Sequence, residues 1–339
     1  MERSVSANRG NEQDAMRRAL ELGEGARQIA PPNPWVGAVV ISADGLRSYD
    51  GATRVPGESH AEIVALKSAG SDAEGGTLVV TLEPCSHTGR TGPCSKAIHE
   101  AGIARVVVGV ADPDVNVQGQ GITSLQEWGI DVEVGMLSEE VERSLAAYLC
   151  HRRTGRPFVV VKLASTLDGQ TAAADRSSQW ITSEEARADV AKLRASCDAI
   201  LVGAGTVRDD NPTLTARTDP PPFRQPERFV LGEIPDGANV LPARSISGSL
   251  EEILDQMGKD GILQLLVEGG ASVAHDFIAE GLADRLVLYL APVLMGGNDG
   301  SPVLKGPGAP TIAEAVRGRF VNVSRIGDDL RMEVDISCP

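Results

Sequence analysis

Alternation of short apolar runs with helical stretches is the sequence feature that most limits how this chain can fold. The apolar runs are rich in Val, Leu and Ile, as expected for strands buried inside a sheet. In the first half we expect strands at 36–42, 77–82, 105–111 and 130–134, and helices at 12–28, 60–69, 94–102, 121–128 and 138–152. Strands separated by helices of this length predict a three-layer α/β/α sandwich.

The segment RTGRP at 153–157 interrupts this pattern, and a new apolar strand follows at once. Since 339 residues are about twice a typical domain, we predict two domains, 1–153 and 154–339. In the second half we expect strands at 158–164, 198–203, 228–231, 262–267 and 285–295, helices at 183–195, 249–258 and 271–280, and a terminal antiparallel pair near 320–326 and 330–336.

Charge and cysteine content narrow the function classes. The net charge of −15 argues against non-specific binding to nucleic acid or to an anionic membrane surface. Five cysteines, an odd number in a long chain, do not suggest a secreted disulfide scaffold. No apolar run reaches the roughly 20 residues of a membrane span, and the start, MERSVSANRGNEQD, has no hydrophobic signal core. We therefore expect a cytoplasmic protein that binds neither nucleic acid nor membrane, with a homo-oligomer left open.

His60-Ala61-Glu62, followed by Pro84-Cys85 and then Cys94, predicts a metal site. One imidazole and two thiolates suit a Zn²⁺ ion that keeps its fourth position open for water, as catalytic zinc sites do. The order His-x-Glu and then Pro-Cys is the signature of zinc nucleobase deaminases, in which the glutamate moves protons and does not bind metal. Eight residues separate the cysteines here, where the signature has two.

Two other interpretations of this group remain open. The ligands could hold a structural zinc ion, or no metal at all. His87 could also be a fourth ligand, but its place two residues after Cys85 is tight for tetrahedral binding. We therefore prefer His87 as a substrate contact.

A long ordered set of motifs resembles the bifunctional deaminase–reductases of riboflavin biosynthesis. From about residue 12 to 336 the segments that carry the resemblance are PNPWVGAVV, GESHAEIVAL, TLEPCSHTGRTGPC, ADPD, KLASTLDGQTA, SSQWITSEEAR, ILVGAGTVRDDNPTLTAR and VEGGASVAHDF. The resemblance implies a cytidine-deaminase-like first domain and a dihydrofolate-reductase-like α/β second domain. The first would remove the 2-amino group of a diaminopyrimidinone ribosylamino 5′-phosphate with Zn²⁺, and the second would use NADPH to reduce the ribosyl group to ribityl.

The resemblance also implies roles for individual residues. In the deaminase half, zinc falls on His60, Cys85 and Cys94, the proton shuttle on Glu62, and substrate contacts on Asn33, His87 and Arg90. Asn33 lies between prolines, so it could equally be a plain turn residue.

In the reductase half, the NADPH positions are Ala164, Trp180, Thr206, Asp210, Gly269, Gly270, Ala271, Ser272, Val273 and Ala274. The substrate positions are Ser178, Arg194, Leu214, Arg217 and Glu268. Without the resemblance, Glu268-Gly269-Gly270 between a strand and a helix could be either a nucleotide site or a packed turn. The two arginines suit a sugar phosphate but could also be ordinary solvated side chains. Lys162 and Asp168 lie in these motifs, and we assign neither a chemical role.

Three departures from the family pattern concern contacts with the substrate. Thr53 stands where the family often has a histidine, Gly92 where it usually has a proline, and the stretch 232–250 is shorter than usual. Two rival functions remain at this point: another zinc deaminase acting on a tRNA adenosine or free cytidine, and a nucleotide-binding sensor with a decayed reductase half.

Overall fold

The computed structural model describes residues 2–86, 92–114 and 117–336, with side chains from residue 10 onward. Contacts along the chain divide it into two compact units, Met1–Thr154 and Gly155–Pro339. Each unit contains its own sheet.

The sheet of the first unit is mixed and has the order β2-β1-β3-β4-β5. Its strands are β1 Gly37–Ile41, β2 Ser48–Ala52, β3 Thr77–Leu82, β4 Arg105–Val110 and β5 Asp131–Val134. Strand β1 is antiparallel to both β2 and β3, whereas β3, β4 and β5 run parallel. The three central strands β1, β3 and β4 are buried almost throughout, as strands covered on both faces must be.

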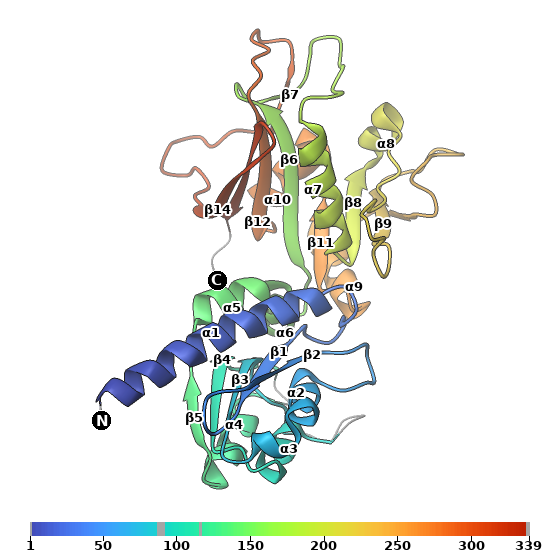
Figure 1. Ribbon diagram of the computed structural model, residues 1–339. Helices are drawn as coiled ribbons and strands as arrows, with labels where there is room; N and C mark the ends of the chain where they lie inside the picture. Colours follow the sequence, from blue (N-terminus) through green and yellow to red (C-terminus); the bar gives the residue numbers. More distant parts are fainter. Residues whose placement is uncertain (1, 87–91, 115–116, 337–339) are drawn as a thin grey trace. The chain divides into compact units, whose positions relative to one another are not determined.

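Helices cover both faces of this sheet (Figure 1). They are α1 Glu2–Ala26, α2 Ala61–Ala69, the short 3₁₀ helix Gly70–Ala73, α3 Cys94–Glu100, α4 Gln120–Glu127, α5 Ser138–Ser144 and α6 Ala146–Thr154. Figure 1 shows α1, α5 and α6 on one side and α2, α3 and α4 on the other. The first unit is therefore a three-layer α/β/α sandwich.

The first unit differs from the sequence-based prediction in several places; helix α1, for example, begins at Glu2 and not at residue 12. The helix expected at 138–152 is broken at Leu145, which separates α5 from α6. The indole N–H of Trp35 donates to the carbonyl oxygen of Ser144 at this break. In a continuous helix this carbonyl would accept a backbone N–H instead. Strand β2 was not predicted, because its sequence SYDGA is polar and lies at the edge of the sheet.

The second unit has an eight-stranded sheet in the order β10-β9-β8-β11-β6-β12-β15-β14. Its strands are β6 Phe158–Thr166, β8 Ala199–Gly203, β9 Glu227–Leu231, β10 Arg244–Ile246, β11 Gln264–Val267, β12 Arg285–Ala291, β14 Arg319–Ile326 and β15 Asp329–Asp335. Neighbours from β10 to β12 are parallel, and β15 is antiparallel to β12 and β14. A separate small pair joins β7 Gln170–Ala172 to β13 Ser301–Pro302.

Alternate residues of the central strands enter two different cores, as the two-residue period of a strand requires. Val159 and Val161 pack with α9 (Leu250–Lys259) and α10 (Ala271–Ala279), whereas Val160 packs on the opposite face with α7 (Glu184–Ala195). Helix α8, Ala204–Asp210, follows β8 directly. The predicted antiparallel terminal strands are confirmed by β14 and β15.

The strand expected at 285–295 is too long, because β12 ends at Ala291. Pro292 has no N–H to continue the ladder, and the Val293 N–H turns back to the Ala291 carbonyl. Helix α8 and the short strands β7, β10 and β13 were not predicted.

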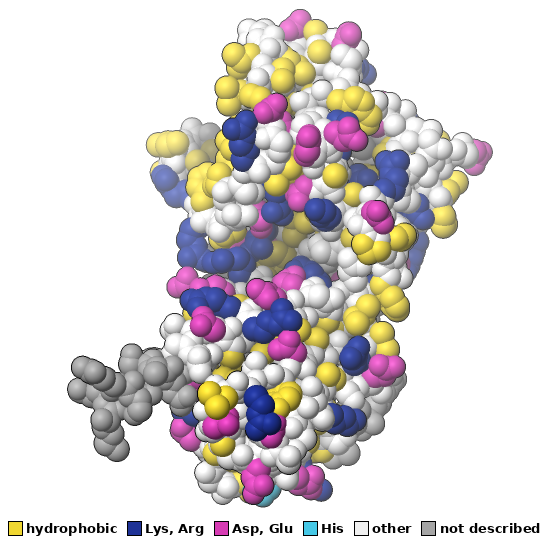
Figure 2. Space-filling model, in the orientation of Figure 1, with side chains coloured by type: hydrophobic (Ala, Val, Ile, Leu, Met, Phe, Trp, Pro, Cys, Tyr) yellow, Lys and Arg dark blue, Asp and Glu magenta, His cyan; other side chains and the backbone are white. Residues whose placement is uncertain are grey.

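Among the described residues, no helix combines the length and apolarity that crossing a membrane requires. On the face drawn in Figure 2, acidic and basic side chains lie among one another over each unit.

Candidate active sites

Three side chains of the first unit converge on one point. His60 Nδ1 lies 3.6 Å from Cys85 Sγ and 3.3 Å from Cys94 Sγ, and all three possible ligand atoms fall within 4.8 Å of one another. Tetrahedral zinc with ordinary Zn–N and Zn–S bond lengths would separate a nitrogen and a sulfur ligand by about 3.6 Å. The donor set and its spacing therefore fit a zinc ion with one position left for water.

Secondary structure fixes each of these ligands. His60 is the residue before α2, and Cys94 is the first residue of α3. Cys85 follows β3, and its turn is held to α3 because the Ser95 N–H donates to the Cys85 carbonyl and the Cys94 N–H donates to the Cys85 sulfur. The ligands thus come from the starts of two helices and the carboxyl end of a strand.

Neighbouring groups give the two thiols different acidities. The Cys94 thiol beside Cys85, together with the His60 imidazole, holds the pKa of Cys85 well below its usual value. The proximity of Cys85 and burial both raise the pKa of Cys94. Binding of Zn²⁺ requires both sulfurs as thiolates, and Cys85 is the one whose thiolate its neighbours favour.

Glu62 lies in the first turn of α2 and is only 4% exposed. Burial raises the pKa of its carboxyl, with the His60 charge acting in the opposite direction. A carboxyl group with a raised pKa beside a metal site can both accept and return a proton near neutral pH.

Where the structure describes them, the other residues that the sequence analysis connected with the deaminase substrate do not form a cluster of this kind. Asn33 lies in the turn before β1, where its N–H donates to the Ala30 carbonyl. Thr53 is buried, and its hydroxyl oxygen accepts the Val36 N–H, so this side chain is used within the protein. His87 and Arg90 lie outside the described residues.

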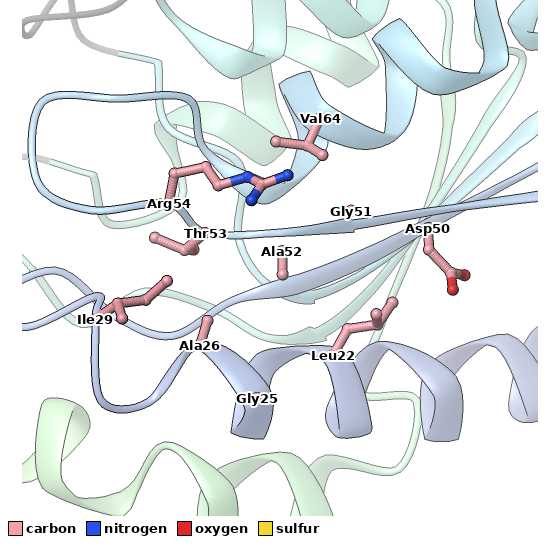
Figure 3. A pocket seen from close by; sticks show the side chains of 10 residues that line it. All are labelled: Leu22, Gly25, Ala26, Ile29, Asp50, Gly51, Ala52, Thr53, Arg54 and Val64. Atoms are coloured by element: carbon pink, nitrogen blue, oxygen red, sulfur yellow. The ribbon is translucent and has the colours of Figure 1, made fainter. Parts of the chain in front are cut away.

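A pocket of about 280 Å³ lies at the β2 edge of the first sheet. In Figure 3 the Arg54 side chain extends toward Val64 of α2, while Leu22 and Ala26 of α1 line the opposite wall. Among the described residues, none of the predicted zinc ligands, the proton shuttle or the predicted substrate contacts lines it.

In the second unit, the predicted NADPH residues gather where parallel strands end. Thr206 and Asp210 belong to α8 after β8, and Gly269 and Gly270 follow β11. A Cβ built on Gly270 would lie 3.5 Å from the Thr206 hydroxyl, so the two segments are adjacent. Helix α10 begins at Ala271, and the N–H groups of a first helical turn have no partners within the helix. Sites of open α/β sheets lie at this edge of the strands.

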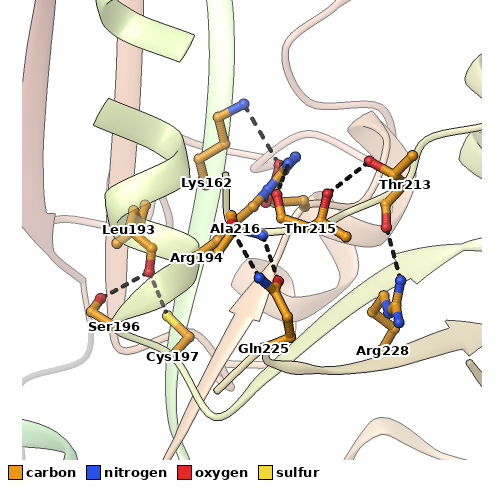
Figure 4. A network of polar contacts seen from close by, with 11 residues as sticks. Lys162, Leu193, Arg194, Ser196, Cys197, Thr213, Thr215, Ala216, Gln225 and Arg228 are labelled. Atoms are coloured by element: carbon orange, nitrogen blue, oxygen red, sulfur yellow. Dashed lines mark hydrogen bonds and ion pairs between the residues drawn. The ribbon is translucent and has the colours of Figure 1, made fainter. Parts of the chain in front are cut away.

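A buried ionic group includes Glu268, the residue directly before Gly269, and Figure 4 shows its Lys162 and Arg194 side chains. Arg194 makes two hydrogen bonds to the Glu268 carboxylate, at 2.5 and 2.8 Å, and a third to the Thr215 carbonyl at 3.3 Å. Lys162 Nζ lies 3.9 Å from the same carboxylate. Burial opposes ionisation of Glu268, but Arg194 and Lys162 outweigh it and hold the carboxyl pKa below its usual value.

Lys162 lies beside this ionic group, and the sequence analysis assigned it no role. Burial lowers the pKa of its ammonium group, although the Glu268 charge opposes this. A lysine among the apolar residues of the buried strand FVVVKLAST is the signal by which the sequence could have marked this position.

The other predicted reductase positions differ in exposure. Trp180 is 70% exposed, and the Arg187 guanidinium lies 4.4 Å from the centre of its ring. The Ser178 hydroxyl lies 3.5 Å from the Asp210 carboxylate, which joins a predicted substrate residue to a predicted cofactor residue. Arg217 is exposed, whereas Leu214 is buried in the core with a φ of 52°. Ala164 lies on β6.

Two family profiles match the chain, one in each unit. Residues 9–110 match the cytidine and deoxycytidylate deaminase zinc-binding region, and residues 157–332 match the RibD C-terminal domain. The chain is 39% identical to the riboflavin biosynthesis protein RibD of Bacillus amyloliquefaciens, with 94% of both chains covered. It is 40% identical to the protein of that name from Mycobacterium tuberculosis (strain CDC 1551), with 95% and 96% covered.

Solved structures agree over both units. Acinetobacter baumannii RibD (form 1) aligns with a TM-score of 0.88 at 32% identity, covering 97% of this chain and 100% of that one. A diaminohydroxyphosphoribosylaminopyrimidine deaminase/5-amino-6-(5-phosphoribosylamino)uracil reductase from Thermotoga maritima aligns with a TM-score of 0.87 at 33% identity, with the same coverage. The predicted fold class, a deaminase domain followed by a reductase domain, is confirmed.

Proposed function

The chain belongs to the RibD family of bifunctional riboflavin-biosynthesis enzymes, and from this we propose a division of labour between its two units. It is a deaminase and a reductase, and its cofactors are Zn²⁺ and NADPH. The first unit would carry out the deamination and the second the reduction, with the boundary next to Gly155. A single-activity zinc deaminase does not account for relatives that match across both halves, whereas a sensor with a decayed reductase half would fail to oxidise NADPH.

The substrate we propose for the first unit is the 2,5-diamino-6-ribosylamino-4(3H)-pyrimidinone 5′-phosphate. The convergence of His60, Cys85 and Cys94 beside buried Glu62 is the observation that carries this proposal. His60, Cys85 and Cys94 would hold a zinc ion, whose contribution would be to lower the pKa of a bound water from about 15.7 toward 7. Glu62 would accept that water's proton and pass it to the ring nitrogen and the leaving ammonia. Asn33, His87 and Arg90 would contact the substrate.

In the second unit, bound NADPH would supply the hydride that, together with a proton, reduces the ribosyl group to ribityl. We propose that the glycines after β11 and the start of α10 hold the cofactor, with Ala164, Trp180, Thr206 and Asp210 around it. Glu268 and Arg194 would face the sugar phosphate with Ser178, Leu214 and Arg217. Their buried hydrogen bonds support this role, because a rigid polar group can align the sugar carbon with the cofactor.

One two-step assay tests both halves. Purified protein given the diaminopyrimidinone phosphate and NADPH should release ammonia and oxidise NADPH. Glu62→Gln should release ammonia and oxidise NADPH at least about 100-fold more slowly with this substrate, yet oxidise NADPH normally when given the deaminated product. NADPH oxidation by Glu62→Gln at the wild-type rate from the diamino substrate would overturn the assigned order of reactions.

We also propose that the protein forms a homo-oligomer. Phe320 and Val323 on the edge strand β14 are 65% and 54% exposed, and apolar residues on a sheet edge favour pairing with another chain. Light scattering should report more than one chain per particle. A Phe320→Lys variant that lowers the measured mass would support β14 as the contact, and a monomeric wild type would contradict the proposal.

A cytoplasmic location completes the proposal. None of the four cysteines among the described residues takes part in a disulfide, as expected in a reducing compartment. Cell fractionation with a tagged chain would test this location, and recovery with the membrane fraction would contradict it.

A further inference from the structure

Glu83 is a buried carboxylate that the proposed chemistry does not use. It follows β3 and precedes Pro84 and the metal ligand Cys85, and only 4% of it is exposed. Glutamate is rarely buried this deeply without partners. No basic side chain among the residues that the structure describes pairs with it, so another kind of group must satisfy its charge.

Four backbone N–H groups supply this compensation. One carboxylate oxygen accepts from Asp112 at 3.2 Å and Gly119 at 3.1 Å, and the other accepts from Gly121 at 3.0 Å and Ile122 at 3.3 Å. Gly121 and Ile122 belong to the first turn of α4, whose N–H groups have no partners within the helix. A single side chain therefore holds both ends of the segment that joins β4 to α4.

This segment also packs directly on the residue before the ligand. A Cβ on Gly121 would overlap the carbonyl oxygen of Pro84, so the two backbones touch. The Glu83 N–H meanwhile donates to the Val110 carbonyl and extends the pairing of β3 with β4. The main chain at residues 83 and 84 is thus fixed from both sides.

The anchored segment is itself attached to another helix of the first unit. The Asp112 carboxylate accepts the Tyr148 hydroxyl at 3.0 Å, and Tyr148 belongs to α6. The Asp114 N–H in turn donates to the Asp112 side chain at 2.9 Å. The position of the Glu83 carboxylate is therefore fixed by the body of the unit and does not depend on one flexible loop.

We propose that Glu83 is a positioning residue for the zinc ligand Cys85, an inference that rests on the proposed function. Hydrogen bonds from α3 hold Cys85 from the C-terminal side, and Glu83 holds the turn from the N-terminal side. A ligand fixed from both sides keeps its sulfur within the few tenths of an ångström that metal binding tolerates. Groups that orient metal ligands typically contribute 10- to 100-fold in metal affinity.

The test compares zinc affinity in two variants. Glu83→Gln keeps the size but turns an NH₂ group toward the backbone donors, and we expect its zinc dissociation constant to rise about 10- to 100-fold in chelator competition. The absorption spectrum of the Co²⁺-substituted protein should shift as well. Asp329→Asn is the matched control, because buried Asp329 accepts the Ser183 N–H and hydroxyl in the other unit. It should lower thermal stability without changing zinc affinity.

A carboxylate that only stabilised the fold would give a different result. Glu83→Gln would then melt at a lower temperature but keep the wild-type zinc affinity and Co²⁺ spectrum, which would overturn the inference. If Glu83→Gln does not fold, Gly121→Ala provides the test, since its methyl group displaces the same turn without changing a charge. Unchanged zinc affinity in folded Gly121→Ala would also overturn the inference that this turn positions Cys85. Failure of the wild type to bind zinc would instead overturn the proposed deaminase function.

Discussion

His60 Nδ1 and Cys94 Sγ lie 3.3 Å apart although 34 positions separate them in the sequence. One residue precedes α2 and the other begins α3, so two helices start at the same point in space. A cation held there joins both helices to the Cys85 turn after β3. Zinc should therefore contribute to the stability of the first unit as well as to its chemistry.

Zinc removal should lower the melting temperature of the first unit. Zinc present at about 1,000 times its dissociation constant stabilises the folded state by about 4 kcal/mol. Calorimetry with and without a chelator should show one transition that moves and a second, from the reductase unit, that does not. His60→Ala serves as the control, because a chelator should have no further effect on it. A chelator-independent melting profile for the wild type would contradict the prediction.

Glu62→Gln should lower the deamination rate constant by about 10²- to 10⁴-fold, the usual contribution of a positioned general base. Zinc content should remain at one ion per chain, since Glu62 is not among the three grouped ligands. Glu58→Gln is a suitable comparison, because Glu58 is exposed in the turn before His60. Equal losses of deamination rate in Glu62→Gln and Glu58→Gln would contradict the role of Glu62 as the proton shuttle.

Glu268→Gln should destabilise the second unit in a pH-dependent way. The folded-state pKa of Glu268 is below its unfolded value, so its ionised form stabilises the fold above about pH 4.5 and this contribution is lost as the pH falls further. We expect a cost of about 3–5 kcal/mol at pH 7, because Arg194 and Lys162 lose their buried counter-charge. Urea unfolding should show that the difference in free energy of unfolding between Glu268→Gln and the wild type is smaller at pH 3.5 than at pH 7. A difference that grows toward low pH would contradict this sign.

Arg187→Ala should release the exposed indole of Trp180. The guanidinium lies 4.4 Å from the ring centre and also donates to the Thr182 carbonyl at 2.7 Å. Stacking of this kind is worth about 0.5–1 kcal/mol, so KM for NADPH should rise roughly two- to five-fold with little change in kcat. Lower fluorescence anisotropy of Trp180 would report the release directly. Arg187→Lys keeps a cation, so its KM for NADPH should lie between those of the wild type and Arg187→Ala. An unchanged KM in Arg187→Ala would exclude a contribution from the contact between Arg187 and Trp180.

The strands and the metal ligands could be predicted because their causes are local in the sequence. Buried parallel strands require continuous apolar runs, and the runs at β3, β4, β6 and β8 match within one or two residues at each end. The zinc ligands belong to motifs in which histidine and cysteine, at these positions, are typical of zinc binding. Pattern and chemistry agree at these positions, so the sequence is informative.

Other features depend on partners far away in the chain. The break at Leu145 accompanies a hydrogen bond from Trp35, which is 109 residues from Ser144. Glu83 is anchored by N–H groups up to 39 residues away, and backbone amides carry no sequence signature. Lys162 became interpretable only once Glu268 and Arg194 were seen beside it.

The order of strands in the two sheets has a consequence for synthesis on the ribosome. All five strands of the first sheet lie before residue 135, so that sheet can close while the second half is still being translated. In the second sheet β6 is made first but pairs with β11 and β12, which emerge more than 95 residues later. The apolar residues of β6 therefore remain without their partner strands until β11 and β12 have been synthesised. We therefore expect the nascent reductase half to depend on chaperones more than the first half does.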